Sequence, residues 1–233
     1  MKKISKKRKE IVQKLDLSKK YDPKEAIKIL KNNSYVKFNE TLDLAIKLSI
    51  DTSKTDQNIR GVINLPHGTG KNIKVAVMAK GDKAIEAKDA GADIVGENDL
   101  IENIQKGILD FDLLIATPDM MSSVGKLGKI LGPKGLMPNP KLGTVTQDIS
   151  SAVKNAKSGQ VQYKNDKSGI IHGGIGKLDF KEEELIENLI AFYDSILKSK
   201  SDNIKKTKGS FIKKVSITST MGFGLEINIG SLH

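Results

Sequence analysis

Three short apolar runs, each followed by a pattern typical of a helix, occupy the middle of this chain. The runs are KVAVMAKG, ADIVG and FDLLIA. The helical patterns are DKAIEAKDAG, residues 100–107 behind a capping box of Asp99 and Glu102, and a segment that begins at Thr117-Pro118. A further helix is predicted from about Asp148 to Ser158. Alternation of short apolar strands with helices predicts a small parallel sheet of doubly wound α/β type.

The two flanking segments instead have the pattern of antiparallel strands. TLDLAIKLSID alternates strictly between apolar and polar residues, which is typical of a strand with one buried face. QVQYKNDKSGIIHGG is predicted to form a hairpin that turns at Asn165–Gly169, and FIKKVSITSTMGFGLEINI one that turns near Met221–Gly224. Helices are predicted over 23–32 behind an Asp22–Glu25 capping box, and from an Asp179–Glu182 cap to about 199.

These patterns predict two domains of different class, α+β and α/β. Residues 1–67 and 160–233 form a discontinuous α+β domain in this interpretation, and residues 68–159 form an α/β domain inserted into it. A glycine-containing hinge at Pro66–Asn72 joins them. The pattern suggests the insertion, but it does not show that the two ends of the chain pair.

The distribution of charge indicates a polyanionic partner. The net charge is +11, of which residues 1–67 carry +8, residues 160–233 carry +2 and residues 68–159 carry +1. Only two of the 39 cations are arginines, Arg8 and Arg60. Because lysine suits phosphates and arginine suits bidentate reading of guanine, recognition of backbone and shape is favoured over reading of base sequence. RNA, DNA and an anionic membrane surface are the candidates.

Several classes of protein are excluded or disfavoured. The chain has no cysteine, which excludes disulfides, thiolate metal sites and cysteine nucleophiles. The apolar runs are far shorter than the roughly 20 residues that a membrane helix needs, and no apolar stretch follows the basic start as in a secretory signal. We therefore expect a cytoplasmic protein without a membrane partner.

The sequence offers little that favours an enzyme. PHGTGKN resembles the end of a phosphate-binding P-loop, but Leu65 and Asn72 stand where that motif needs glycine and Ser or Thr. His67, His172 and His233 have no metal-like spacing, and no nucleophile–base arrangement stands out. We expect no catalytic residues, no metal and no cofactor. An enzyme that acts on a phosphorylated small molecule remains an alternative.

Four segments are candidates for contact with nucleic acid. The basic arm MKKISKKRKEIVQKLDLSKK is either a solvated terminus or a polyanion-binding arm. KFNET places a cation and Phe38 just before a strand, where the ring either stacks on RNA or enters the core. STMG places hydroxyls and a glycine at a hairpin tip. GKLGKILGPKGLMPNP is predicted to be a shaped loop with cations beside an acidic α/β body.

Taken together, these stretches resemble the bacterial ribosomal protein L1 family of the large-subunit mobile stalk. The resemblance covers nearly the whole chain and is carried, in family order, by KFNETLDLAIKL, RGVINLPHGTGK, GPKGLMPNPKLGTVT, NDKSGIIH and TSTMG. It implies a first domain formed by both termini and an inserted Rossmann-like second domain. Two departures are Phe223, where the family usually has proline, and Gly173-Gly174, where Ala-Pro is more usual.

The resemblance also implies a function and a set of RNA contacts. The family binds large-subunit rRNA mainly through the first domain, helps to release deacylated tRNA from the exit site, and represses translation of its own mRNA. The implied partners are therefore these three RNAs and other components of the large subunit, with a monomer when free. The implied RNA-binding residues are Lys37, Phe38, Thr41, Asp166, Lys167, Ser168, Ser219, Thr220, Met221 and Gly222. Possible secondary contacts are Lys126, Lys129, Lys134 and Lys141.

Overall fold

The computed structural model describes residues 15–16, 19–54, 57–200 and 210–232. These residues divide into two compact units. The first contains the segments up to Gly70 and from Val161 onward, and the second is Lys71–Gln160. Most of the basic arm, residues 201–209 and His233 lie outside the described residues.

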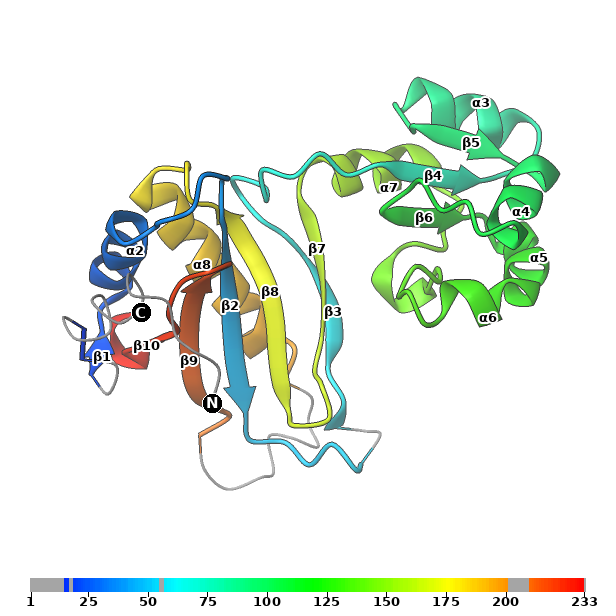
Figure 1. Ribbon diagram of the computed structural model, residues 1–233. Coiled ribbons are helices and arrows are strands. Elements are labelled where there is room, and N and C mark those ends of the chain that lie inside the picture. Colours follow the sequence, from blue (N-terminus) through cyan, green and yellow to red (C-terminus); the bar gives the residue numbers. More distant parts are fainter. Residues whose placement is uncertain (1–14, 17–18, 55–56, 201–209, 233) are drawn as a thin grey trace. The chain divides into compact units, whose positions relative to one another are not determined.

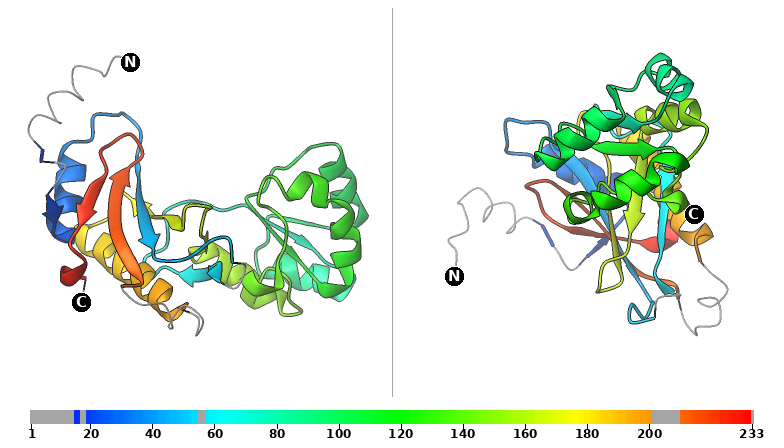
Figure 2. Two further views of the ribbon diagram at one scale, coloured as in Figure 1. Left: turned by 90° about the horizontal axis from the view of Figure 1, so that it is seen from below. Right: turned by 90° about the vertical axis from the view of Figure 1, so that its right-hand side faces the viewer.

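The first unit is built on a five-stranded sheet. Its order is β1-β10-β9-β2-β8, with antiparallel pairing throughout except between β1 and β10. Helices α2 and α8 pack side by side against one face of this sheet (Figures 1 and 2). The elements are β1 (Lys20–Tyr21), α2 (Pro23–Asn32), β2 (Thr41–Leu48), β8 (Ile170–Lys177), α8 (Glu182–Lys198), β9 (Ile212–Ser219) and β10 (Leu225–Ile227).

The alternation in β2 creates the main core. Leu42, Leu44, Ile46 and Leu48 point toward the helices and are buried, while the residues between them are half-exposed or exposed. The predicted half-exposed antiparallel strand is confirmed, although it ends at Leu48. Phe192 of α8 is fully buried in the same core. Burial of such side chains stabilises the unit by about 1.5–3 kcal/mol each, before entropy is counted.

One of the two predicted hairpins is confirmed and the other is only partly correct. β9 and β10 pair around the turn near Met221, as predicted. β7 (Gln160–Lys164) instead pairs with β3 (Arg60–Asn64) in a separate two-stranded sheet, and β8 joins β2. A single bridge, Asn165 to Ile171, is all of the expected hairpin ladder that the described residues form. β8 pairs with β2 because its apolar residues contribute to the core beneath the helices, where Ile171 is fully buried.

The predicted helices form, but four predicted caps, Asp22, Asp99, Thr117 and Asp179, make no side-chain cap hydrogen bond. Asp22 is the N-cap of α2 without a side-chain hydrogen bond, and Asp99 lies within the first turn of α4 (Asn98–Gln105) rather than before it. α8 begins behind Lys181, whose backbone N–H donates to the Glu184 carboxylate at 3.0 Å. Asp179 is too early to cap this helix, and its carboxylate accepts from Asn39 instead.

The second unit is a three-stranded parallel sheet with helices on both faces (Figure 1). Its order β5-β4-β6 and its alternation of strands and helices confirm the predicted α/β class. One apolar cluster joins the sheet to α4 and α5, and another joins it to α3 and α7. The strands are β4 (Val75–Met78), β5 (Ile94–Gly96) and β6 (Leu113–Ala116); the helices are α3 (Asp82–Asp89), α4 (Asn98–Gln105), η2 (Pro118–Met120), α5 (Met121–Lys126), α6 (Gly128–Leu131), η3 (Pro140–Leu142) and α7 (Ile149–Lys157).

The segment from Gly125 to Pro140 is less irregular than predicted. The end of α5 and all of α6 occupy its first half, so only the part after Leu131 is a loop. Leu127 and Leu131 are buried in the apolar cluster beneath α4 and α5. Spacing of these leucines four residues apart places them on one helical face, which explains why the glycine-rich stretch becomes helical.

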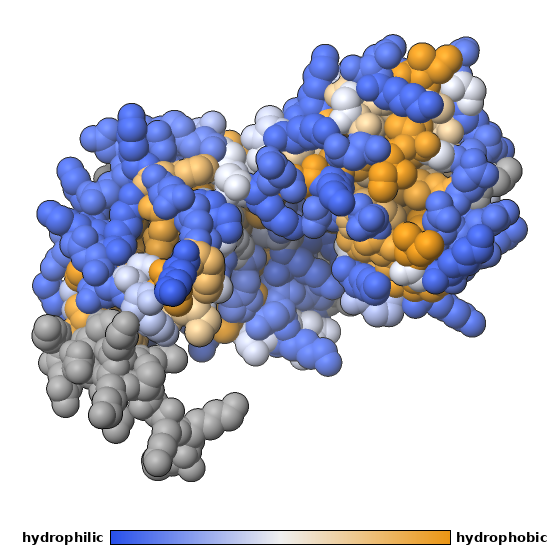
Figure 3. Space-filling model, turned by 45° about the horizontal axis from the view of Figure 1, so that its top comes forward, coloured by the Kyte–Doolittle hydropathy of each residue, from blue (hydrophilic) through white to orange (hydrophobic). Residues whose placement is uncertain are grey.

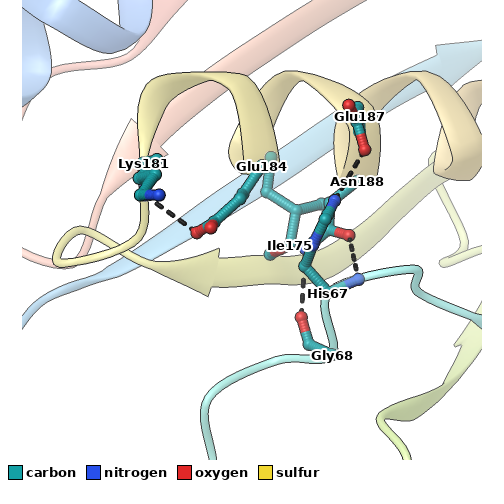
Figure 4. A network of polar contacts seen from close by, with 7 residues as sticks. All are labelled: His67, Gly68, Ile175, Lys181, Glu184, Glu187 and Asn188. Carbon is teal, nitrogen blue, oxygen red and sulfur yellow. Dashed lines mark hydrogen bonds and ion pairs between the residues drawn. The ribbon is translucent and has the colours of Figure 1, made fainter.

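Asn188 of α8 fixes the segment that leads out of the first unit (Figure 4). Its fully buried side chain accepts from the His67 N–H at 3.1 Å and donates to the carbonyls of Gly68 at 3.0 Å and Ile175 at 2.8 Å. The His67 ring lies 2.6 Å from the Glu187 carboxylate. The start of the predicted hinge is thus bound to α8. None of the described helices is long and apolar enough to cross a membrane.

Candidate nucleic-acid interface

The register of the sheet sorts the predicted RNA-binding residues of the first unit into two groups. Thr41 begins β2, and its neighbour Leu42 pairs with Ser219 at the end of β9. The segment with Lys37 and Phe38 and the turn Ser219–Gly222 therefore meet at one end of the sheet. Asp166–Ser168 lie at the other end, because the turn precedes β8 and Leu48 donates to Gly169. The eight residues of β2 separate the groups by about 25 Å.

A side chain extends the ladder between β2 and β9 at the first group. The Thr220 hydroxyl accepts from the Thr41 N–H at 3.0 Å and lies 3.3 Å from the Thr41 carbonyl, to which it can donate. The Thr220 N–H also donates to that carbonyl, at 3.1 Å. The hydroxyl of Thr220 is therefore bonded within the protein, and it fixes the turn to the start of β2.

Two residues that the sequence did not single out hold the same turn. The Glu40 carboxylate is buried, with only 2% of the residue exposed, and accepts from the Met221 N–H at 2.8 Å. The Tyr35 hydroxyl donates to the Met221 carbonyl at 3.0 Å. Nothing in the sequence links positions 35 and 40 to 221. The one available signal was Glu40, an acidic residue placed directly before a strand whose alternate residues are apolar and buried.

Glycine at position 222 leaves room for the side chain of Ser219. A Cβ at Gly222 would lie 2.2 Å from the Ser219 Oγ. Ser219 and Phe223 are both buried. The phenylalanine that stands where the family usually has proline is therefore packed inside the protein and is not at the surface. Phe38 and Met221 remain open, with 54% and 47% of each residue exposed.

The second group is a turn closed by Asp166. Its carboxylate accepts from the backbone N–H groups of Ser168 and Ile170, each at 2.8 Å. The Ile170 hydrogen bond, aided by Ser168 and by His172 nearby, holds the pKa of the Asp166 carboxyl below its ordinary value. The Lys167 carbonyl accepts from the Thr52 hydroxyl at 2.7 Å. The side chains of Lys167 and Ser168 are left exposed on a fixed backbone.

The sheet face opposite the helices carries a second acidic group near Thr41. Burial raises the pKa of the Asp43 carboxyl, and Lys177 and His172 offset this only in part. Lys177 itself donates to the Thr41 hydroxyl at 2.9 Å. Among the residues that the structure describes, no group of three or more His, Asp or Glu side chains is arranged to hold a metal ion.

Comparison with known proteins identifies the family. Residues 30–223 match the model of the ribosomal protein L1p/L10e family. The chain is 54% identical over 226 residues to the large ribosomal subunit protein uL1 of Coxiella burnetii, covering 97% of this chain and 96% of the relative. It is 53% identical over 233 residues to the protein of the same name from Photobacterium profundum, covering 100% and 99%.

The chain belongs to the ribosomal protein L1p/L10e family. The resemblance noted from the sequence motifs is thereby confirmed. As a member of the L1p/L10e family the chain is an RNA-binding ribosomal protein and not an enzyme, so the alternative of an enzyme acting on a phosphorylated small molecule is wrong.

The four lysines expected to make secondary contacts lie in the second unit of this L1p/L10e protein. All are exposed, and they are distributed over the end of α5, over α6, over the loop that follows and over η3. No acidic residue occurs between Asp119 and Asp148, so the local charge is positive. Elsewhere on this unit apolar side chains gather at the surface (Figure 3), and Ile85 and Ile108 are 61% and 56% exposed.

Proposed function

We propose that this protein is a constituent of the large ribosomal subunit that binds large-subunit rRNA at the mobile stalk through its first unit. The observation that carries the proposal is the meeting of the Lys37–Thr41 segment with the Ser219–Gly222 turn, from opposite ends of the chain. Exposed Phe38 and Met221 and the Lys37 cation lie on a backbone fixed by Glu40 and Thr220. Such a surface suits a folded RNA with unpaired nucleotides.

Asp166–Ser168 would form a second contact with the same RNA. The anionic Asp166 would shape the turn, while Lys167 and Ser168 would reach a phosphate or a 2′-hydroxyl. Two contacts about 25 Å apart would select RNA by shape, because only a suitably folded surface reaches both.

The proposal also includes release of tRNA, repression of the protein's own mRNA, and a cytoplasmic location. The lysines of the second unit, Lys126, Lys129, Lys134 and Lys141, would contact exit-site tRNA and assist its release. The first unit would also bind a leader segment of the protein's own mRNA that resembles the ribosomal site, and would thereby repress translation. The free protein would be a monomer, and its setting would be the cytoplasm.

Competition binding tests the rRNA proposal. A labelled stalk-rRNA fragment is bound to the full-length protein and displaced with unlabelled stalk rRNA, the protein's leader mRNA, random RNA or duplex DNA of equal charge. We expect displacement in the order stalk rRNA, leader mRNA and only then the two controls. Equal displacement by all four would show a generic nucleic-acid binder and would refute the proposal.

The salt dependence of the same binding should be steep. With about five phosphate contacts, the affinity should fall on the order of 3,000-fold for a tenfold rise in salt concentration, because counterions are released when lysines neutralise phosphates. Filter binding between about 0.05 and 0.5 M salt measures the slope. A flat response would contradict a contact made through lysines and phosphates.

A further inference from the structure

A surface hollow lies beside Phe38 in the first unit. Its volume is about 410 Å³, within the range of about 300–1,000 Å³ typical of small-molecule sites. The wall is mostly polar and includes Ser34, the exposed cation Lys37 and the carboxylates of Glu40 and Asp179, together with Phe38, Val36 and Leu178. The hollow lies at the same end of the sheet as the Ser219–Gly222 turn.

Three hydrogen bonds hold the walls of the hollow, two to the segment before α8 and one to the turn at Met221. Lys31 of α2 donates to the Phe180 carbonyl, and Asn39 donates to Asp179, which tie the two sides together. Glu40 at the edge of the hollow accepts from Met221. The hollow is therefore formed before any partner binds, and a ligand need not supply the free energy to open it.

The exposed position of Phe38 calls for an explanation. A ring that is 54% exposed loses most of the stabilisation that burial would give it. Beside a cation and a largely polar hollow, such a ring offers a stacking face for a base. Single-stranded nucleotides are the part of RNA that proteins recognise through such aromatic faces.

We propose that the hollow receives one unpaired nucleotide of the bound RNA, with its base turned out of the stack against Phe38 and its phosphate near Lys37. The proposal rests on the rRNA-binding function above and adds to it a subsite for a single extruded nucleotide. Such a subsite would favour RNAs with an unpaired position at the right place over fully paired RNAs of equal charge.

Fluorescent base analogues in the rRNA fragment test this subsite. 2-Aminopurine is placed at each unpaired purine in turn, and pyrrolo-cytosine at each unpaired pyrimidine. We expect one position to brighten several-fold on binding, because a base that leaves its stack loses quenching by its neighbours. Ser34→Trp, which fills the hollow from an exposed wall residue, should abolish this brightening and weaken binding about tenfold. Phe38→Leu should behave similarly, and Phe38→Trp should preserve both signals.

Ser122→Trp is the matched control, since Ser122 is an exposed serine on α5 of the second unit. It should leave brightening and affinity unchanged, and both tryptophan variants should unfold at the wild-type temperature. Tight binding without brightening at any position, or brightening that survives Ser34→Trp, would overturn the subsite while leaving rRNA binding intact. Absence of binding by the wild-type protein would instead refute the proposed function on which the subsite rests.

Discussion

The contact between Thr220 and Thr41 changes the role expected of a hydroxyl in the TSTMG motif. From the sequence, Thr220 was a candidate to bond RNA directly. In the structure its oxygen accepts from one backbone group of Thr41 and lies within bonding distance of the other. We therefore expect Thr220 to contribute to RNA binding through the geometry of the turn, as a positioning residue.

Thr220→Val should destabilise the protein and weaken RNA binding together. The substitution keeps the shape but leaves the Thr41 N–H without its hydroxyl partner, at a cost of about 1 kcal/mol in the free energy of unfolding. Urea unfolding and filter binding measure the two effects. Thr220→Ser retains the hydroxyl and should restore both. Loss of affinity with wild-type stability would assign the hydroxyl to RNA instead.

The Asp43 carboxyl should make the free energy of unfolding depend on pH with a sign opposite to that of most carboxylates. Burial raises its pKa in the folded protein, so the folded state binds the proton more tightly than the unfolded state, and ionisation destabilises the fold. Asp43→Asn should therefore be more stable than the wild type at pH 7. The difference should shrink as the pH falls through the folded pKa toward the unfolded value of about 3.9. Urea unfolding at pH 7 and near pH 4 measures it, and a less stable variant at pH 7 would count against this.

At the scale of elements, β8 and α8 approach each other closely where the chain departs from its family. A Cβ at Gly173 would lie 2.6 Å from the Phe192 ring, which is fully buried in the core. The family's more usual alanine at this position would occupy the space that the ring fills here. Gly173 and Phe192 thus form a matched pair in which one small residue accommodates one large residue.

Gly173→Ala should cost about 1–3 kcal/mol of unfolding free energy, because the added methyl group would force the fully buried Phe192 ring to shift. Thermal and urea unfolding measure the loss. In the double variant Phe192→Leu/Gly173→Ala, the loss of unfolding free energy should be smaller than the sum of the losses in the two single variants. Additive effects would show that the two side chains do not share this space.

The sequence predicted most elements because their signals are local. The alternation in β2 and the apolar runs of the second unit needed no partner to be recognised. The failures were those of pairing and capping. The local sequence contains no signal that β8 pairs with β2 rather than with β7. It also contains no signal that Asp179 accepts a hydrogen bond from Asn39, 140 residues away. Glu40 and Tyr35 were missed for the same reason, since their value at the site depends on Met221.

At the scale of the molecule, the two units differ in their suitability for RNA. Residues 1–70 with 161–233 carry a net charge of +10, and residues 71–160 carry +1. Within the second unit, the stretch from Asp82 to Asp119 holds ten acids and three lysines, whereas the segment between Asp119 and Asp148 holds four lysines and no acid. The first unit should therefore supply most of the affinity for rRNA.

Substituting charges in each unit separates their roles. Changing Lys126, Lys129, Lys134 and Lys141 to Gln should alter rRNA affinity by less than about fivefold and leave the salt slope unchanged. Changing only Lys37 and Lys167 to Gln should lower that slope by about 1.4, because two phosphate contacts are lost. Filter binding over a series of salt concentrations measures both variants. If the variant of the four second-unit lysines lowered rRNA affinity more than the Lys37 and Lys167 variant, the principal rRNA contact would lie in the second unit.

The joining of Thr41 to Thr220 also sets when the protein becomes able to act during its own synthesis. One partner is translated early and the other only after 178 intervening residues have been added. Until β9 and the turn behind it leave the ribosome, β2 has no neighbour on that side, and the Lys37–Thr41 segment cannot meet the Ser219–Gly222 turn. If this surface binds RNA as we propose, a growing chain cannot engage RNA through it, and only a chain finished through this turn would compete for rRNA.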